Sequence, residues 1–455
     1  MTVNRRSWSA PNDRELRLWR VGRALTLAFA AAVLVAGGVL YGLVMLLDFK
    51  EIDTTAKLDA KTLFDLVKLS FGVVAGSGAL VALVVAYRRQ RVDEAGAHRE
   101  ATRLHTERFS QAVDKLGSDS PAVRLGGVHA LAGLADDAPD DSLRQTCIDV
   151  LCAYLRLPFS PDPGEVPASF PDGTSPSEEQ ADAHQNKRDQ YRALREVRRT
   201  ILRLIGDHYR IPKGAHRSWQ GCNLDLTGVT IDGQMNFRGA AFSSGNVSFN
   251  GAAFSSSYVS FEDAKFSGGS VNFRGAAFSS GNVNFNGAAF SSGNVNFNGA
   301  AFSSGNVNFN GAAFSSGNVN FNGAAFSGGN VNFNGARFSG GNVDFRSAAF
   351  SGGNVNFNGA AFSGSDVHFH SARFSGGYVY FTGTAFSGGN VSFAEAAFSG
   401  SNVSFAGERG SASFSGSNVD FSTSTGPAPA GLLWTVGTPA PAEVRLRSDW
   451  LPATP

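Results

Sequence analysis

The sequence predicts an all-β solenoid, and three observations in its second half carry this prediction. Phenylalanine recurs every twelve residues from Phe254 to Phe398, and a second series with the same period runs from Phe249 to Phe405. A valine stands two residues before each member of the second series. A repeat this short can bury its apolar side chains only by stacking on its neighbours, so the chain should wind into a coil.

Each twelve-residue unit is predicted to hold two very short strands and two corners. Val283 and Phe285 lie two residues apart and therefore point to one side of a strand, and Ala288 and Phe290 form a second inward pair. The Asn-Gly and Ser-Ser-Gly-Asn segments between the strands are turn sequences, because Gly and Asn accept a positive φ at low cost. Charged residues avoid the inward positions in every copy, which supports this facing.

Two such double units are expected in each coil. A twelve-residue coil would be too narrow to enclose two Phe and a Val, whereas about 24 residues give four faces and a filled interior. Successive coils should then rise by about 4.8 Å, the spacing of neighbouring strands. Outward asparagines such as Asn284 and Asn296 can stack into side-chain ladders along the coils.

With this spacing the chain resembles the pentapeptide-repeat proteins. Residues 283–287 and 288–292 each place a small residue two positions before a large one, and residues 222–226 match the commoner leucine form of that unit. The resemblance covers about residues 220–421 and implies a four-sided, right-handed β-helix. The extra Gly-Asn pair after every second large residue departs from the family pattern.

Two transmembrane helices are predicted before the solenoid. Residues 24–47 and 69–87 carry no charge and are long enough to cross about 30 Å of hydrocarbon. A signal peptide is the alternative for the first run, but that run is long and a second follows it. Arginines flank the hairpin on both sides, so the positive-inside rule places both termini in the cytoplasm. The prediction is a two-span protein of the cell membrane with the lipid bilayer as a partner, and glycine pairs in the spans allow a homo-oligomer through the transmembrane helices.

The remaining segments follow from composition and apolar periodicity. Residues 188–210 predict a basic amphipathic helix whose arginines either contact anionic lipid or nucleic acid or form a solvated face beside the solenoid. Residues 92–157 show three apolar stripes at helical spacing, and this stretch together with the two spans before it resembles membrane-anchored pentapeptide-repeat proteins of actinobacteria. The predicted order is a cytoplasmic basic segment (1–23), a transmembrane hairpin (24–87), a cytoplasmic helical region (88–157), a disordered linker (158–187), the basic helix (188–210), the solenoid (211–421) and a Pro-rich cap or tail (422–455).

The sequence holds little that points to chemistry. Its three cysteines are few and irregularly spaced, which is typical of reduced thiols rather than of a disulfide framework. His368 and His370 face the same outward side, but two ligands do not make a metal site. Because no phosphate-binding glycine loop and no catalytic constellation is present, we expect no enzyme activity, no cofactor and no metal.

The predicted function is a membrane-anchored, non-catalytic scaffold whose solenoid surface binds an unknown cytoplasmic protein. Arg and Tyr are favoured as interface anchors. The candidate surface consists of outward side chains that break the monotony of the repeats: Arg337, Arg346, His368, His370, Arg373, Tyr378 and Tyr380.

Two alternative functions remain open at this point. One is a DNA mimic that protects a topoisomerase, or another regulator related to nucleic acid, and the other is a small membrane transport or sensing component. Mimicry needs rows of acidic side chains. Residues 237–421 carry seven Lys or Arg and seven Asp or Glu, so this wall is neutral and nucleic acid is not expected as a partner.

Overall fold

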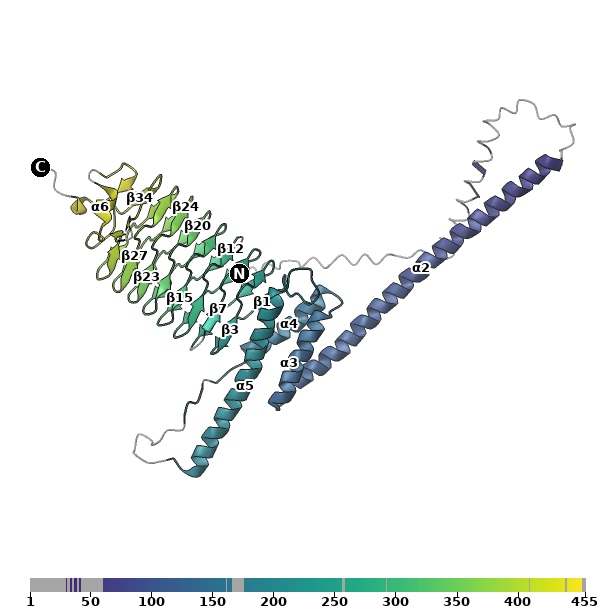
Figure 1. Cartoon of the computed structure of the whole chain (residues 1–455), viewed down its shortest axis with the longest axis horizontal. Helices are drawn as coiled ribbons and strands as arrows, with labels where there is room; N and C mark the ends of the chain where they lie inside the picture. Colours follow the sequence, from purple (N-terminus) through teal and green to yellow (C-terminus); the bar gives the residue numbers. More distant parts are fainter. Residues whose placement is uncertain are drawn as a thin grey trace, which may run out of the picture. The chain divides into compact units, whose positions relative to one another are not determined.

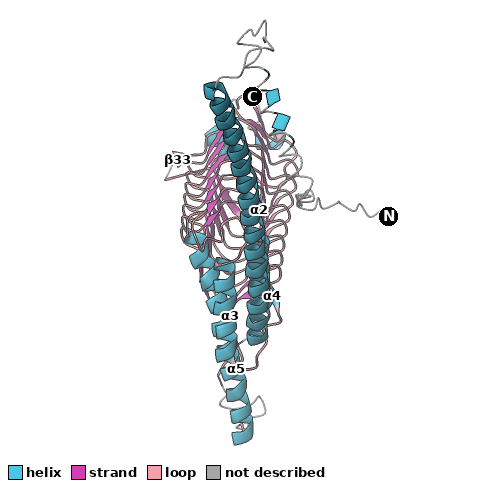
Figure 2. Cartoon of the chain, turned by 90° about the vertical axis from the view of Figure 1, so that its right-hand side faces the viewer, coloured by secondary structure: helices cyan, strands magenta, loops and turns pink. Residues whose placement is uncertain are grey.

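The computed structural model describes residues 60–160, 162–165, 176–255, 258–291, 293–408, 410–437 and 440–451, with a few isolated positions between residues 30 and 41. Contacts divide the chain into two compact units, Met1–Thr102 and Arg103–Pro455. Figure 1 labels the helices and strands in chain order, and Figure 2 distinguishes them by colour.

A single helix, α2 (Ala60–Leu116), holds the second of the two predicted membrane spans. Among the described residues no helix is long and apolar enough to cross a membrane. For this part of the chain the prediction of two spans, and the cell-membrane localisation drawn from it, are therefore wrong. That prediction rested on the absence of charge in residues 69–87, which in the structure form the middle of α2, and this helix continues without interruption into Arg88 and Arg89. Residues 24–47 lie almost entirely outside the described residues.

Three further helices form a small bundle with the last turns of α2. They are α3 (Pro121–Asp136), α4 (Asp141–Arg156) and α5 (Glu178–Arg210). Their apolar stripes meet in one core, in which Leu131, Ile148, Leu151 and Ile201 are fully buried. This packing buries the stripes that the sequence shows at helical spacing.

Helix α5 begins earlier than the sequence predicts, at Glu178 rather than at residue 188. Ser177 accepts a hydrogen bond from the backbone N–H of Gln180, and the side chain of Gln180 accepts one from the backbone N–H of Ser177. This capping box and the acidic residues after it stabilise a helix start inside a segment whose polar composition suggested a linker.

The solenoid consists of four parallel sheets, named here A to D in the order in which each coil passes through them. Sheet A holds β1 (Leu224–Asp225), β5 (Val247–Ser248), β9 (Val271–Asn272), β13 (Val295–Asn296), β17 (Val319–Asn320), β21 (Val343–Asp344), β25 (Val367–His368), β29 (Asn390–Ser392), β34 (Asn418–Asp420) and β35 (Val444–Arg445). Sheet B holds β2 (Thr230–Ile231), β6 (Ala253–Phe254), β10 (Ala277–Phe278), β14 (Ala301–Phe302), β18 (Ala325–Phe326), β22 (Ala349–Phe350), β26 (Arg373–Phe374) and β30 (Ala397–Phe398).

The other two sheets complete each coil. Sheet C holds β3 (Gln234–Asn236), β7 (Tyr258–Ser260), β11 (Asn282–Asn284), β15 (Val307–Asn308), β19 (Val331–Asn332), β23 (Asn354–Asn356), β27 (Tyr378–Tyr380) and β31 (Asn402–Ser404). Sheet D holds β4 (Ala241–Phe242), β8 (Lys265–Phe266), β12 (Ala289–Phe290), β16 (Ala313–Phe314), β20 (Arg337–Ser339), β24 (Ala361–Ser363) and β28 (Ala385–Ser387). A small antiparallel pair, β32 (Ala406–Gly407) and β33 (Gly410–Ser411), stands outside the four sheets.

The register of these sheets confirms the predicted coil. Val295 pairs with Val271 on one side and with Val319 on the other, so each coil holds 24 residues, or two units. The regular part forms a parallel β-solenoid of about nine turns. The predicted facing is also confirmed, because the Val, Phe and inward Ala positions of the repeats are buried.

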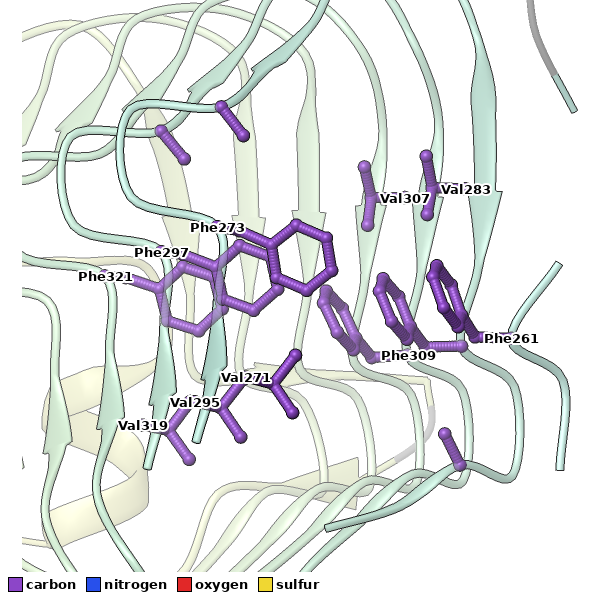
Figure 3. Packing of buried hydrophobic residues seen from close by; sticks show 14 of the residues in the cluster. Phe261, Val271, Phe273, Val283, Val295, Phe297, Val307, Phe309, Val319 and Phe321 are labelled. Atoms are coloured by element: carbon purple, nitrogen blue, oxygen red, sulfur yellow. The ribbon is translucent and has the colours of Figure 1, made fainter. Parts of the chain in front are cut away.

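The interior is built from stacked phenylalanine rings (Figure 3). Phe285 lies 4.8 Å from Phe309 in the next coil, with an angle of only 3° between the rings, so the rings stack at the strand spacing. Phe285 also meets Phe297 edge to face, with ring centroids 6.4 Å apart and an interplanar angle of 89°. Both arrangements are favourable for aromatic pairs, and together they fill the lumen.

The asparagines do not stack in the row that the sequence suggested. Asn296, between Val and Phe, accepts a hydrogen bond from the backbone N–H of Asn298 at 2.8 Å and so stays within its own turn. The asparagine before Val bonds between coils instead: the side chain of Asn294 accepts from the N–H of Asn318 at 2.9 Å. The ladder therefore runs along the position before Val.

The C-terminal residues cover the last coil. Strand β35 extends sheet A by pairing with β34. The helix α6 (Leu432–Val436) buries Leu432 but leaves Trp434 77% exposed. Trp450, in the 3-10 helix η1 (Ser448–Trp450), contacts Phe421 and donates a hydrogen bond to the carbonyl oxygen of Gly426 at 3.0 Å. These contacts close an end that would otherwise leave strand edges unpaired.

Candidate functional site

The seven candidate surface residues lie on all four sheets of the solenoid. Arg337 lies on sheet D. His368 lies on sheet A, and Arg346 and His370 stand at the corners that follow it. Arg373 lies on sheet B, and the remaining two, Tyr378 and Tyr380, lie on sheet C. The structure therefore does not gather all seven on one face.

One coil holds five of the seven, which follow one another around the wall. His368 and His370 precede Arg373, and Tyr378 begins the next strand of the same coil. Arg346 joins this group from the preceding coil, because Asp344 pairs in register with His368. We call Arg346, His370, Arg373 and Tyr378 the sheet B margin. Arg337 is separate from this group because it lies on sheet D. Along the coil, sheet D is two strands away from sheet B in either direction.

Two acidic residues that the sequence analysis did not select hold part of this margin in place. Asp344 is buried and receives the guanidinium of Arg346, with Nε of Arg346 2.9 Å from both carboxylate oxygens. Glu395 lies 3.4 Å from Nε2 of His370. The predicted 24-residue coil could have revealed the positions of both acidic residues. Asp344 stands one coil before His368, and Glu395 stands one coil after Ser371.

The electrostatic environment of Asp344 favours its charged form. Burial by itself would raise the pKa of this carboxyl. Hydrogen bonds from Arg346 and charge interactions with Arg346 and His368 outweigh burial, so the pKa lies below its ordinary value. Asp344 therefore stays ionised near neutral pH and fixes the orientation of Arg346.

Arg373 differs from Arg346 because it makes no ion pair with any described residue. It occupies an outward position that holds alanine in both neighbouring coils, where it pairs in register with Ala349 and Ala397. Its side chain is exposed. Tyr378 is 46% exposed, and its ring stacks on Tyr380 with centroids 5.9 Å apart. An arginine and a tyrosine thus project from a wall of small side chains.

The basic helix α5 contacts the first coil of the solenoid. Nη2 of Arg195 donates to the carbonyl oxygen of Asp232 at 2.8 Å, and Nη2 of Arg198 donates to that of Thr230 at 2.9 Å. Nε of Arg210 donates to the carbonyl oxygen of Arg238 at 3.0 Å. These arginines satisfy carbonyl groups that a first coil leaves without a neighbouring strand.

A buried cluster around Asp136 joins the helices to the start of the solenoid. Asp136 accepts hydrogen bonds from Nε1 of Trp219 at 3.0 Å and from Nε of Arg217 at 2.9 Å, and Nε2 of His208 lies 3.1 Å away. Burial opposes the charge on Asp136, but these partners outweigh it and lower its pKa. Since the carboxylate is enclosed by its own partners, the cluster is a structural junction.

The cysteines provide no reactive group. All three are free and buried. Burial raises the pKa of the Cys147 and Cys152 thiols to about 12 and that of Cys222 to about 11, so the thiolate form is scarce. Among the described residues there is also no group of three or more His, Cys, Asp or Glu that could hold a metal ion.

The geometry of the described residues defines the class of protein as a repeat β-solenoid. Comparison of the chain with protein-family models, curated proteins and solved structures gives no match. The regular parallel solenoid is compatible with a pentapeptide-repeat protein, but no family match assigns the chain to that family or to its membrane-anchored type.

Proposed function

We propose that this protein is a non-catalytic scaffold that binds another protein through the sheet B margin. The observation that carries the proposal is the position of Arg373, an exposed arginine without an ion-pair partner among the described residues, in the same coil as His370 and Tyr378. Arg337 is also exposed and without an ion pair among the described residues, but it stands apart from this group on sheet D. Arg346 and His370 stand at neighbouring corners, and Tyr378 follows in the same coil. Exposed arginine and tyrosine on a rigid wall are typical of protein interfaces.

The chemistry of the margin indicates the kind of surface that fits it. The unpaired guanidinium of Arg373 favours a carboxylate on the partner, which it can bind with two parallel hydrogen bonds. The alanines above and below Arg373 allow close approach of a flat surface. A row of alanines with one arginine does not reproduce the dense negative charge of DNA, which disfavours the DNA-mimic alternative.

The test compares two arginines in equivalent positions. The full-length chain, an Arg373→Ser variant and an Arg337→Ser variant are immobilised and exposed to extract from the source cells, and captured proteins are quantified by mass spectrometry. The expected partner is captured equally by wild type and Arg337→Ser, and at least about tenfold less by Arg373→Ser.

Arg337 is a matched control because it also replaces an outward alanine, with Ala313 and Ala361 in register on either side. Circular dichroism should give the same spectrum for all three proteins, since both arginines lie outside the core. Equal capture of every protein by the two variants would exclude the sheet B margin as the binding surface.

A further inference from the structure

A pocket of about 430 Å³ lies in the helical bundle, and all of its described lining residues precede the solenoid. Its walls come from the end of α2, from α3, α4 and α5, and from the chain that follows α4. Val113, Leu116, Val150, Ala153 and Leu194 make much of this lining apolar. The volume is within the range of pockets that hold small molecules.

The hydroxyl group of Tyr154 is the first sign that the pocket is built for a ligand. Tyr154 lines the pocket, and its hydroxyl is buried without a hydrogen-bond partner among the described residues. A buried hydroxyl in this state costs stability, because its hydrogen bonds to water have been lost without replacement. A ligand with an acceptor oxygen would restore that hydrogen bond.

Arg198 is the second sign. It is only 5% exposed and lines the same pocket, where its guanidinium lies 4.5 Å from the centroid of the Phe159 ring. One of its N–H groups reaches the carbonyl oxygen of Thr230, and no ion pair joins it to a described carboxylate. Burial lowers the pKa of Arg198 even though the carboxylate of Asp232 is near enough to favour its charge. An anion in the pocket would therefore stabilise the buried cation further.

The charge of the pocket lining also favours an anion. Arg124 is a second arginine in the pocket wall, and no Asp or Glu is among the described residues that line it. We propose that this pocket binds a small apolar carboxylic acid, with its hydrocarbon part against the apolar walls and its carboxylate between Tyr154 and Arg198. The inference is independent of the scaffold role, because it concerns helices and not the sheet B margin.

The test uses phenylbutyrate as the probe and phenylbutyramide as its uncharged match, with the full-length chain and isothermal titration calorimetry. Phenylbutyrate should bind at least about tenfold more tightly than the amide, because only the acid neutralises Arg198. Tyr154→Phe should weaken phenylbutyrate binding about tenfold, since it removes one hydrogen bond to a charged group. The same variant should not lower the melting temperature, because the hydroxyl has no partner in the free protein.

Two further variants make the result decisive. Ala153→Trp should fill the pocket and abolish binding, whereas Tyr258→Phe, which alters an exposed tyrosine on sheet C, should bind phenylbutyrate as the wild type does. If the Ala153→Trp variant does not fold, the binding measured with Tyr154→Phe still tests whether the pocket holds the acid. Equal binding of acid and amide, unchanged binding by Tyr154→Phe, or no binding of phenylbutyrate at millimolar concentration would each overturn the proposal.

Discussion

Each coil of the solenoid turns by two kinds of corner, and they differ in how much they tolerate. The short corners follow sheets A and C, as at Asn322-Gly323, and the long corners follow sheets B and D, as in residues 315–318. A Cβ atom added at Gly323 would meet nothing within 4 Å. A Cβ atom at Gly317 would lie 2.1 Å from the carbonyl oxygen of Gly293 in the preceding coil.

The sequence of the repeats follows this difference. At the short-corner position equivalent to Gly323, four copies carry another residue with φ between 55° and 57°: Asp263, Ser347, Ser371 and Glu395. The long corners keep glycine at the crowded position in most copies, and where Ser365 replaces it the positive φ moves to Gly364. Short corners thus select for backbone conformation alone, whereas long corners also select for close contact between coils.

The largest expected effect comes from adding one methyl group to each corner of the same coil. Gly317→Ala should destabilise the protein by about 3 kcal/mol or more, because it combines a left-handed residue with a collision against backbone. Gly323→Ala should cost about 1 kcal/mol, since only the left-handed conformation is unfavourable there. Urea denaturation of the full-length variants, followed by circular dichroism, measures both, and equal losses would contradict the distinction between the corners.

An intermediate effect is expected from the asparagines beside the two corners. The side chain of Asn318 accepts from the N–H of Asn342 in the next coil at 2.9 Å, and that of Asn320 accepts from the N–H of Asn322 in the same turn at 2.8 Å. Replacing either with Ala should cost about 1 kcal/mol. Hydrogen exchange should separate them: Asn318→Ala accelerates exchange near residue 342, and Asn320→Ala accelerates it near residue 322. Unchanged exchange near residue 342 in Asn318→Ala would show that the long-corner asparagine does not connect coils.

The smallest expected effect is a gain in stability at a short corner. Ser347 has φ +55° and its side chain makes no hydrogen bond to a described residue. Ser347→Gly should raise the free energy of unfolding by about 0.5 to 1 kcal/mol, because relief of the left-handed strain exceeds the added entropy of the unfolded chain. The measurement is the midpoint of urea denaturation. A loss of stability would mean that the short corners require more than a permissive backbone.

Much of the solenoid could be predicted from the sequence, whereas the candidate binding surface could only be predicted in part. The spacing of Val283, Phe285, Ala288 and Phe290 determines which side chains are inward, because alternation along a strand is local. The seven candidate residues were chosen as outward departures from the repeat, but their distribution over four sheets depends on the coil. The 24-residue coil that the sequence predicts already places Arg346 one turn from His370, but the ion pairs of these two residues with Asp344 and Glu395 are visible only in the structure.

The arginines of α5 show what the amino-acid order could not reveal. Their helical pattern indicated a basic face, but two of its residues, Arg195 and Arg198, donate to carbonyl groups of the first coil. The membrane prediction is contradicted by a different finding, that no described helix is long and apolar enough to span a membrane.

The sequence by itself determined the repeat, its inward and outward positions, the number of residues in a coil and the places where the chain turns. These features depend on the period of apolar residues and on local turn chemistry, which are complete within a few residues. The tertiary structure decided which glycines have no room for a side chain, which arginines form ion pairs, and that Tyr154 and Arg198 line one pocket. Those features arise only when segments distant in sequence pack together, so no local pattern could specify them.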